Sequence, residues 1–175
     1  MLITIGGPAG SGKTTVAQGL AQKLDFVHIS AGDAFRQLAQ EHSTDLEQFS
    51  TFAEDHPDID RLVDQKQVEL VQSYENVVVD GRLSGWILTG DIAVWLKAPV
   101  DIRAARIAQR ENISYATALY ETRARDGSEA KRYHAIYGID LHNLDIYDLV
   151  IDTTHWDQFG VIAIVLQALK VHKER

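Results

Sequence analysis

Short runs of apolar residues alternate along the chain with longer stretches in which apolar residues recur every three or four positions. A short continuous apolar run predicts a strand buried on both faces, whereas a recurrence near 3.6 residues predicts an amphipathic helix. The runs that predict strands are Leu2–Ile5, Phe26–Ile29, Asn76–Gly81, Ile92–Leu96 and Leu149–Asp152.

The helical pattern fills the intervals between these runs. After Lys13, for example, Val16, Leu20 and Leu24 recur every four residues and would place one apolar face on a sheet. A glycine inside a helix costs about 1 kcal/mol relative to alanine, so Gly127 predicts a bend or hinge in its helix. Further helices are predicted from Asp33, from Leu46 to Phe52, from Pro57, from Pro99, from Ser114 to Tyr137 and from Asp157 onward.

The alternation of strands and helices predicts an α/β fold in which helices cover both faces of a five-stranded parallel sheet. Right-handed crossovers then produce a doubly wound, three-layer arrangement that binds ligands at the carboxyl ends of its strands. A length of 175 residues suits a single domain spanning residues 1–175.

The chain contains no cysteine and carries a formal net charge of −8. The lack of cysteine excludes disulfide and zinc–thiolate scaffolds and suits a reducing compartment, so we expect a cytoplasmic protein. An acidic balance disfavours a nucleic-acid polymer as partner, although a nucleotide site needs only a local cluster of positive charge. The first apolar run is too short for a signal peptide or a membrane span, and we expect a monomer without membrane contacts.

A glycine-rich segment stands between the first predicted strand and the first predicted helix. It matches the phosphate-binding pattern G-x-x-x-x-G-K-S/T in full. Glycines let successive main-chain amides point at a phosphate, and the positive end of the next helix adds to the attraction. Lys13 would contact the β- and γ-phosphates of ATP, and the Thr14 hydroxyl would bind Mg²⁺. The predicted ATP-binding segment consists of Gly7, Pro8, Ala9, Gly10, Ser11, Gly12, Lys13, Thr14 and Thr15.

Asp80 ends the third predicted strand. Because the carboxyl ends of parallel strands meet at one edge of a sheet, we expect this carboxylate near the P-loop. There it would hold Mg²⁺ directly or through water, which makes Thr14 and Asp80 the predicted metal-binding pair.

Two arginines follow neighbouring strand ends. Arg36 lies one helical turn after the second strand, and Arg82 follows Asp80 and Gly81 at the end of the third. Guanidinium groups bind phosphate in a bidentate manner, so this pair predicts a second phosphate site opposite the P-loop.

Two further sets of charged residues share one helix face each at three- and four-residue spacing. Ordinary surface helices also carry such charges, as ion pairs worth only tenths of a kcal/mol. A solvated face therefore stays an alternative for the first set. That alternative is weaker for the second set, because the expected hinge at Gly127 lies between two of its members. The first set is Arg103, Arg106 and Arg110, and the second is Arg125, Glu129 and Arg132.

Several phrases of the sequence together resemble a known family. They are the P-loop, ISAGDAFR (Ile29 to Arg36), VVVDGR (Val77 to Arg82), DGRLSGW, WLKAP, KRYHAIYGID and IYDLVIDT, in that order. Over essentially its whole length the chain resembles the nucleoside monophosphate kinases, and within them the compact archaeal-type cytidylate kinases. The resemblance implies a P-loop NTPase fold with a helical segment near residues 33–73 that binds the nucleoside monophosphate (NMP). It also implies a short lid near residues 114–139.

The resemblance implies roles for individual residues as well. Arg106 and Arg110 would flank the ATP side of the site. Arg125, Glu129 and Arg132 match a lid spacing of arginine, acid, arginine, in which the acid touches the ribose and the arginines hold phosphates. The residues implied in NMP binding are Ser30, Asp33, Arg36, Gly81, Arg82, Ser84, Glu129 and Arg132.

The implied reaction is ATP + CMP to ADP + CDP, with dCMP as a second acceptor and Mg²⁺ as cofactor. Phosphoryl transfer depends on positioning and charge neutralisation more than on acid–base chemistry, so we predict no catalytic base. The predicted catalytic residues are Lys13, Arg125 and Arg132, with Arg132 in closest contact with the migrating phosphoryl group.

The sequence departs from the family pattern at one position. Bacterial cytidylate kinases have an aspartate that reads cytosine after the DGR motif, where this chain has Leu83. Base recognition must therefore come from elsewhere, either from Ser84 or from the polar helix around Asp60 and Arg61.

Other readings of the P-loop stay open. The nearest alternatives are kinases with another acceptor, namely UMP, AMP, shikimate or gluconate in place of CMP. A P-loop ATPase or GTPase switch and a nucleotide-binding assembly factor belong to other classes of function. The seven histidines show no spacing suited to a metal and are expected to be structural or solvated, and the three tryptophans are expected to pack in the core.

Overall fold

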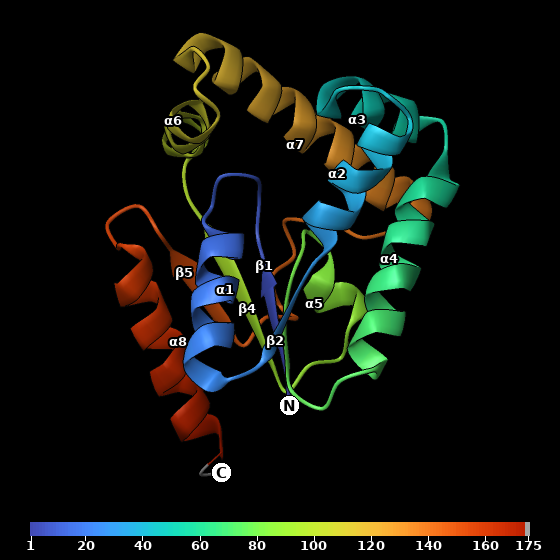
Figure 1. Cartoon of the computed structure of the whole chain (residues 1–175). Helices are drawn as coiled ribbons and strands as arrows, with labels where there is room; N and C mark the ends of the chain where they lie inside the picture. The colour runs from blue at the N-terminus through green and yellow to red at the C-terminus, as the bar shows by residue number, and fades with distance from the viewer. Residues whose placement is uncertain (174–175) are drawn as a thin grey trace.

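In a computed structural model that describes residues 1–173, the chain forms one five-stranded sheet. Its strand order is β2-β3-β1-β4-β5, and every neighbouring pair is parallel (Figure 1). The predicted five-stranded parallel sheet is confirmed. The strands are β1 (Leu2–Gly6), β2 (Val27–Ser30), β3 (Val77–Asp80), β4 (Ile92–Lys97) and β5 (Leu149–Asp152).

Helices cover both faces of this sheet, as the apolar pattern predicts. Val78 of the inner strand β3 packs with α1 and α8, whereas its neighbours Val77 and Val79 pack with α4 on the opposite face. Within residues 1–173, no helix is both long and apolar enough to cross a membrane. The helices are α1 (Lys13–Leu24), α2 (Ala31–Glu41), α3 (Leu46–Glu54), α4 (Pro57–Gln72), α5 (Ser84–Ile87), α6 (Val100–Glu111), α7 (Tyr115–Tyr137) and α8 (Gln158–Lys173).

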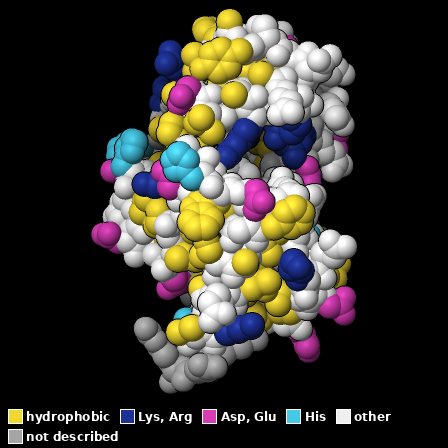
Figure 2. All heavy atoms as spheres, turned by 90° about the vertical axis from the view of Figure 1, so that its left-hand side faces the viewer, with side chains coloured by type: hydrophobic (Ala, Val, Ile, Leu, Met, Phe, Trp, Pro, Cys, Tyr) yellow, Lys and Arg dark blue, Asp and Glu magenta, His cyan; other side chains and the backbone are white. Residues whose placement is uncertain are grey.

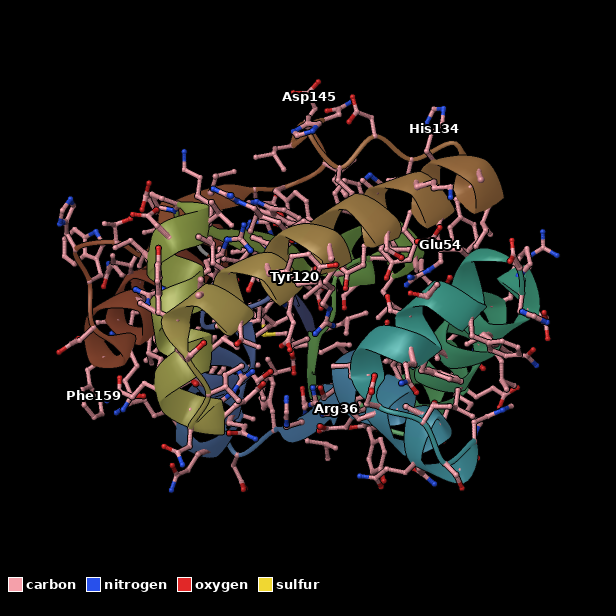
Figure 3. The ribbon with its side chains drawn as sticks, turned by 90° about the horizontal axis from the view of Figure 1, so that it is seen from above. Arg36, Glu54, Tyr120, His134, Asp145 and Phe159 are labelled. Atoms are coloured by element: carbon pink, nitrogen blue, oxygen red, sulfur yellow. The ribbon has the colours of Figure 1, made fainter. Side chains whose placement is uncertain are left out.

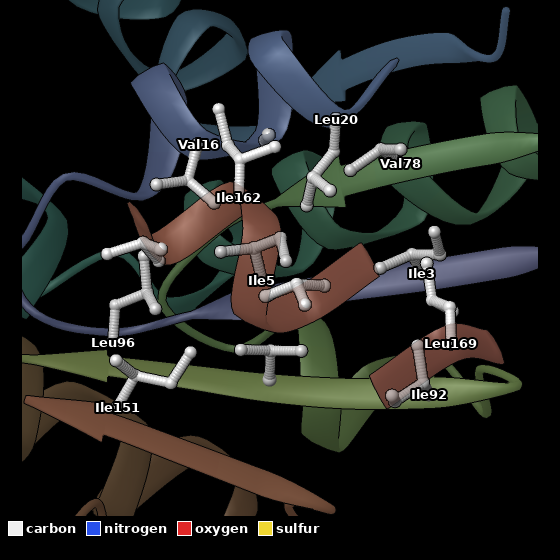
Figure 4. Packing of buried hydrophobic residues seen from close by; sticks show 14 of the residues in the cluster. Ile3, Ile5, Val16, Leu20, Val78, Ile92, Leu96, Ile151, Ile162 and Leu169 are labelled. Carbon is white, nitrogen blue, oxygen red and sulfur yellow. The ribbon is translucent and has the colours of Figure 1, made fainter. Parts of the chain in front are cut away.

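The main core lies between the sheet and the α1–α8 layer (Figure 4). Ile5 of β1, Leu20 of α1 and Val165 of α8 meet there and are completely buried. Burying one such side chain contributes about 1.5–3 kcal/mol, so this cluster anchors the P-loop at the end of β1.

The register of the strands brings the predicted site together. Asp80 at the end of β3 pairs with Ile5 of β1 on one side and with Ser30 of β2 on the other. The segments that follow these three strands are the P-loop, the start of α2 and Gly81. They are therefore neighbours at one edge of the sheet.

Helices α2, α3 and α4 form a second, smaller core beyond this edge, and α7 crosses over it (Figure 1). Phe49 of α3 is completely buried there, with its ring 5.0 Å from that of Phe35 on α2. Because this cluster is separate from the main core, the α2–α4 segment has packing of its own.

Gly127 does not interrupt its helix, and the bend or hinge expected there stays a prediction. α7 runs as one helix of 23 residues from Tyr115 to Tyr137, with Gly127 inside it. A Cβ atom on Gly127 would meet nothing within 4 Å, so the glycine is not required by packing. Contacts of α7 with α6 and α3 outweigh the cost of about 1 kcal/mol that the glycine imposes.

Three smaller expectations also need correction. α2 begins at Ala31, directly after β2, and the short helix α5 was not predicted. Two of the three tryptophans do pack, since the rings of Trp86 and Trp95 lie 5.7 Å apart. The third, Trp156, is 54% exposed.

Candidate active site

The P-loop folds into a tight turn between β1 and α1. Gly7, Gly10 and Gly12 adopt φ values of 143°, 76° and 96°, a region that other residues rarely enter. A Cβ atom on Gly7 would lie 2.2 Å from the main-chain oxygen of Leu96, so only glycine fits there. α1 begins at Lys13, and Gly12 before it has no side chain to cap the first amides, which stay available to an anion.

The Lys13 ammonium group turns back over the loop and donates a 2.9 Å hydrogen bond to the main-chain oxygen of Pro8. Burial first, and the charge of Arg82 second, lower the pKa of Lys13 from 10.5 to about 7, against the opposing attraction of Asp80 and Glu129. A phosphate beside the amine would raise this pKa again and restore its charge. The Lys13 amine is therefore positioned to bind an anion.

Asp80 is held between the side chains of Thr14 and His28. The Thr14 hydroxyl donates a 2.9 Å hydrogen bond to Asp80 Oδ2, and His28 Nε2 lies 2.7 Å from Asp80 Oδ1. The structure thus brings the predicted pair Thr14 and Asp80 together. His28 was expected to be structural or solvated, and its contact with this carboxylate was missed because a lone histidine on β2 gives no spacing signal.

Arg82 faces inward and meets two acidic residues of α7. Its Nε lies 3.2 Å from Glu129 Oε2, and its Nη2 lies 3.4 Å from Asp126 Oδ1. Arg125 donates a 2.7 Å hydrogen bond to Glu129 from the next turn of the helix. Burial would raise the pKa of Glu129, but Arg125 and Arg82 outweigh it and lower the pKa to about 2. Among the described residues, Nη1 of Arg82 has no hydrogen-bond partner, which leaves it open to a ligand.

Arg36 lies less deeply than Arg82. It pairs with Asp33 one turn earlier on α2, and both side chains are largely exposed. Ser30 at the end of β2 has a buried hydroxyl that, within residues 1–173, makes no hydrogen bond. The Ser84 hydroxyl near Gly81 is in the same condition in this part of the chain.

One cavity of about 100 Å³ joins the predicted phosphate sites. P-loop residues that include Lys13 line one side, and Arg36, Arg82, Arg125 and Glu129 line the other. The structure therefore brings residues of both predicted phosphate sites to one cavity at the sheet edge, where the parallel strands end.

The predicted ATP-side residues Arg106 and Arg110 differ in their contacts, and Arg103 of the same helix face is buried. Arg106 donates to both the hydroxyl and the main-chain oxygen of Thr153, at 2.9 and 2.7 Å, and lies 3.4 Å from the Gly10 oxygen. Arg103 is buried and donates to the main-chain oxygen of Ala9 at 3.0 Å, which excludes a solvated face for it. Arg110 is exposed.

A second cavity of about 330 Å³ adjoins the P-loop between α6 and the start of α8. Arg106, Arg110, Thr153 and Trp156 are among its lining residues. On the face that carries α6 and α8, Lys and Arg side chains gather near the middle of the molecule, where the surface is hollowed (Figure 2).

Arg132 is bound to the α2–α4 segment. Its Nε donates a 2.8 Å hydrogen bond to Asp60, and its Nη1 donates to the hydroxyls of Ser50 and Ser128 at 3.0 and 2.8 Å. Its side chain is 3% exposed. The structure does not bring Arg132 to the cavity around Lys13, and its role in catalysis stays a prediction. Asp60 and Ser50 as its partners were not predicted from sequence.

An opening lies between α3, α6 and the first half of α7, whereas α3 and α7 are in contact farther along. Glu54 of α3 and Tyr120 of α7 lie on opposite sides of it (Figure 3) and are among the residues that line a cleft of about 440 Å³. Arg125 reaches this cleft as well as the cavity around Lys13. The site is therefore open to solvent between the α2–α4 segment and α7.

The overall structure resembles solved kinases. One is a shikimate kinase from Acinetobacter baumannii in complex with shikimate, with a TM-score of 0.63, 17% identity and coverage of 99% of this chain and 95% of that chain. Another is a deoxyadenosine kinase from M. mycoides with dCMP and dCDP bound, with a TM-score of 0.59, 15% identity and coverage of 98% and 100%. With the P-loop geometry, this likeness places the fold among the P-loop kinases.

Sequence similarity is more specific. A model of the cytidylate kinase-like family matches residues 2–155. A cytidylate kinase of Methanocella arvoryzae is 50% identical over 169 residues, which are 97% of each chain. One of Methanocaldococcus jannaschii is 48% identical over 174 residues, again 97% of each. The chain belongs to the cytidylate kinase-like family.

Proposed function

We propose that the protein transfers the γ-phosphoryl group of ATP to CMP, giving ADP and CDP, and that dCMP is a second acceptor. The observation that carries this proposal is the single cavity lined by Lys13 of the P-loop on one side and Arg82 on the other. A transferase must hold two phosphates against each other, whereas a hydrolase needs only one such site. The relatives named cytidylate kinases, at 48–50% identity, support CMP as the acceptor.

On the donor side, the amides of residues 7–15 and the Lys13 amine would bind the ATP phosphates. The cavity beside Arg106, Arg110 and Trp156 is continuous with the P-loop and would take the rest of the nucleotide. Arg106 holds the P-loop through Gly10 and so acts there by positioning as much as by contact.

On the acceptor side, Arg82 would bind the CMP phosphate through its free Nη1. Arg36 would join it after exchanging its exposed pairing with Asp33 for the phosphate, a change that costs little for an exposed ion pair. The unpartnered hydroxyls of Ser30 and Ser84 flank the same strand ends and complete the predicted NMP site beside Gly81 and Glu129.

Catalysis would rest on charge neutralisation by Lys13 and Arg125, both at the cavity between the two phosphates. Arg132 can reach the phosphoryl group only by leaving Asp60, so its proposed contribution requires a rearrangement of α7 against α4. Water is excluded when residues 33–73 and 114–139 close on the substrates, which would favour transfer over hydrolysis.

The residues around Asp80 fit a magnesium ion. Asp80 is a buried carboxylate whose partners are the Thr14 hydroxyl and the His28 ring. Neither partner carries the fixed positive charge of an arginine. Mg²⁺ prefers such oxygen ligands together with substrate phosphates, and it would neutralise charge on the β- and γ-phosphates when bound. Thr14 and Asp80 would hold it, and His28 would keep the carboxylate oriented.

The experiment that tests the proposal is a parallel measurement of initial rates with MgATP and CMP, dCMP, UMP, AMP or shikimate. We expect CMP and dCMP to give the highest kcat/KM. A preference for another acceptor would show that the protein is a kinase for that acceptor and not for CMP. ATP hydrolysis that no acceptor stimulates would instead indicate an ATPase or an assembly factor.

A further inference from the structure

One face of α4 looks into the acceptor region. Asp60, Asp64 and Gln67 follow each other at spacings of four and three residues, so they lie on one side of the helix. All three line a small cavity together with Arg82 and Tyr133. Arg82 also lines the cavity around Lys13, so the α4 cavity begins at the proposed phosphate site and extends away from the P-loop.

Gln67 is a buried amide without a partner. Its side chain is 3% exposed, and no described residue forms a hydrogen bond with its Nε2. A Cβ atom built on Gly81 would lie 3.3 Å from this nitrogen and 2.8 Å from the Ala31 side chain, so the amide lies above the strand ends that hold the acceptor. An unpaired buried amide destabilises the fold, and a ligand that pairs with it would recover that cost.

Asp64 offers the complementary group. Its Oδ2 accepts a 2.5 Å hydrogen bond from the Tyr137 hydroxyl, which orients the carboxylate. Among the described residues, Tyr137 is the hydrogen-bond donor to Asp64, and it engages Oδ2, so Oδ1 stays available where Asp64 lines the cavity. Asp60, by contrast, is occupied by Arg132. Besides Arg82 and Glu129, which the proposed function assigns to the phosphate site, the cavity therefore presents a donor on Gln67 and an acceptor on Asp64.

We infer that Gln67 and Asp64 read the base of the acceptor nucleotide, an inference that rests on the proposed function. Cytosine carries an amino donor at C4 next to the acceptors N3 and O2. The Gln67 amide donates to N3 or O2, and the free Asp64 oxygen accepts from the C4 amino group. Uracil places a carbonyl oxygen where cytosine has the amino group, and this oxygen would face the carboxylate and be repelled.

The size of the cavity adds a requirement. At about 50 Å³ it is too small for a pyrimidine ring together with its hydrogen-bond partners. The base can therefore enter only if α4 and α2 move apart from α7. The separate core of the α2–α4 segment allows such a movement as a unit.

The test compares three variants. Gln67→Met keeps the volume of the side chain and removes its donor, and Asp64→Asn keeps the shape and turns an acceptor into a donor. The matched control is Gln65→Met, the same exchange at an exposed position on the same helix. kcat and KM are measured for CMP, UMP and ATP, together with the melting temperature. The ratio of kcat/KM for CMP to that for UMP does not depend on the fraction of folded enzyme.

We expect Gln67→Met to raise KM for CMP about tenfold or more, with KM for ATP within about twofold of the original. Asp64→Asn should lower the CMP-to-UMP ratio about tenfold or more, while Gln65→Met leaves both quantities unchanged. If KM for CMP in Gln67→Met and the ratio in Asp64→Asn both stay within threefold of the original protein, the assignment is overturned. A failure of the proposed function looks different, because the original protein itself would then not prefer CMP.

Discussion

The Thr14 hydroxyl donates a 2.9 Å hydrogen bond to Asp80 and so joins the end of the P-loop to the end of β3, 66 residues later in the chain. His28 holds the other oxygen of the same carboxylate from the neighbouring strand. The carboxylate is therefore oriented before any nucleotide arrives. Such preorganisation lowers the cost of assembling a charged site around substrate.

Exchanging Asp80 for asparagine removes the charge and keeps the shape. We expect Asp80→Asn to lower the apparent affinity for Mg²⁺, measured through turnover, by about 10–100-fold. Titration of Mg²⁺ at a fixed ATP concentration measures this shift, and calorimetry of ADP binding with and without Mg²⁺ measures it independently of turnover. Asp25→Asn is the control, since Asp25 is exposed and has a positive φ that asparagine also accepts. Equal Mg²⁺ titrations of Asp80→Asn and the control would remove Asp80 from the metal site.

Replacing Lys13 separates function from stability. Lys13→Met should lower kcat by about 100–1000-fold or more, because the phosphates lose their main cationic contact. The same variant should be more stable than the original protein at pH 7. Folding lowers the pKa of Lys13 to about 7, so between pH 7 and 10.5 the unfolded chain binds more protons, and the stability of the original protein rises with pH. Thermal melts across this range should show the advantage of the variant shrinking as the pH rises. An advantage independent of pH would contradict the lowered pKa.

Arg82 is best tested by a substitution that keeps its charge. Arg82→Lys still compensates Glu129 but cannot bind phosphate through a planar fork. We expect kcat/KM for CMP to fall about 30–100-fold and KM for ATP to change less than about threefold. A melting temperature close to that of the original protein would show that the loss is not one of folding. Unchanged kinetics with CMP would place the acceptor site elsewhere.

Arg132 has two possible contributions, to stability and to the reaction. Arg132→Met leaves Asp60 buried without its partner and should destabilise the fold by about 3–5 kcal/mol. The double variant Arg132→Met/Asp60→Asn removes that unpaired charge and should recover most of the stability, as chemical denaturation would measure. If Arg132 also contacts the migrating phosphoryl group, kcat stays low in the double variant. A full recovery of kcat would limit Arg132 to binding α7 to the α2–α4 segment.

Local patterns were sufficient to predict the frame of the site. The P-loop has a contiguous signature, and the apolar run that ends at Asp80 predicts both a buried strand and the place of its carboxylate. Both predictions depend on residues close together in sequence, and the parallel register then aligns the strand ends without further information.

Pairings between distant helices were beyond that reasoning. The spacing of Arg125, Glu129 and Arg132 gives no sign that Arg132 turns toward Asp60 while Glu129 turns toward Arg82. These choices depend on how α7 packs across α3 and α4, which is a property of the folded chain. α7 continues through Gly127 for the same reason, since a local cost of about 1 kcal/mol is small beside the packing of a long helix.

Because α7 is one continuous helix, it couples the two elements to which it is attached, α6 and α4. Asp126 near its middle is held by Arg103 of α6, and Tyr137 at its end is held by Asp64 of α4. A rod of 23 residues, about 34 Å long, cannot tilt at one attachment without shifting the other. Binding of a nucleotide on the donor side should therefore change the affinity of the acceptor side for CMP. Calorimetry would measure this as a change in CMP affinity when a non-hydrolysable ATP analogue is present. An unchanged affinity would show that the two sides of the site move independently.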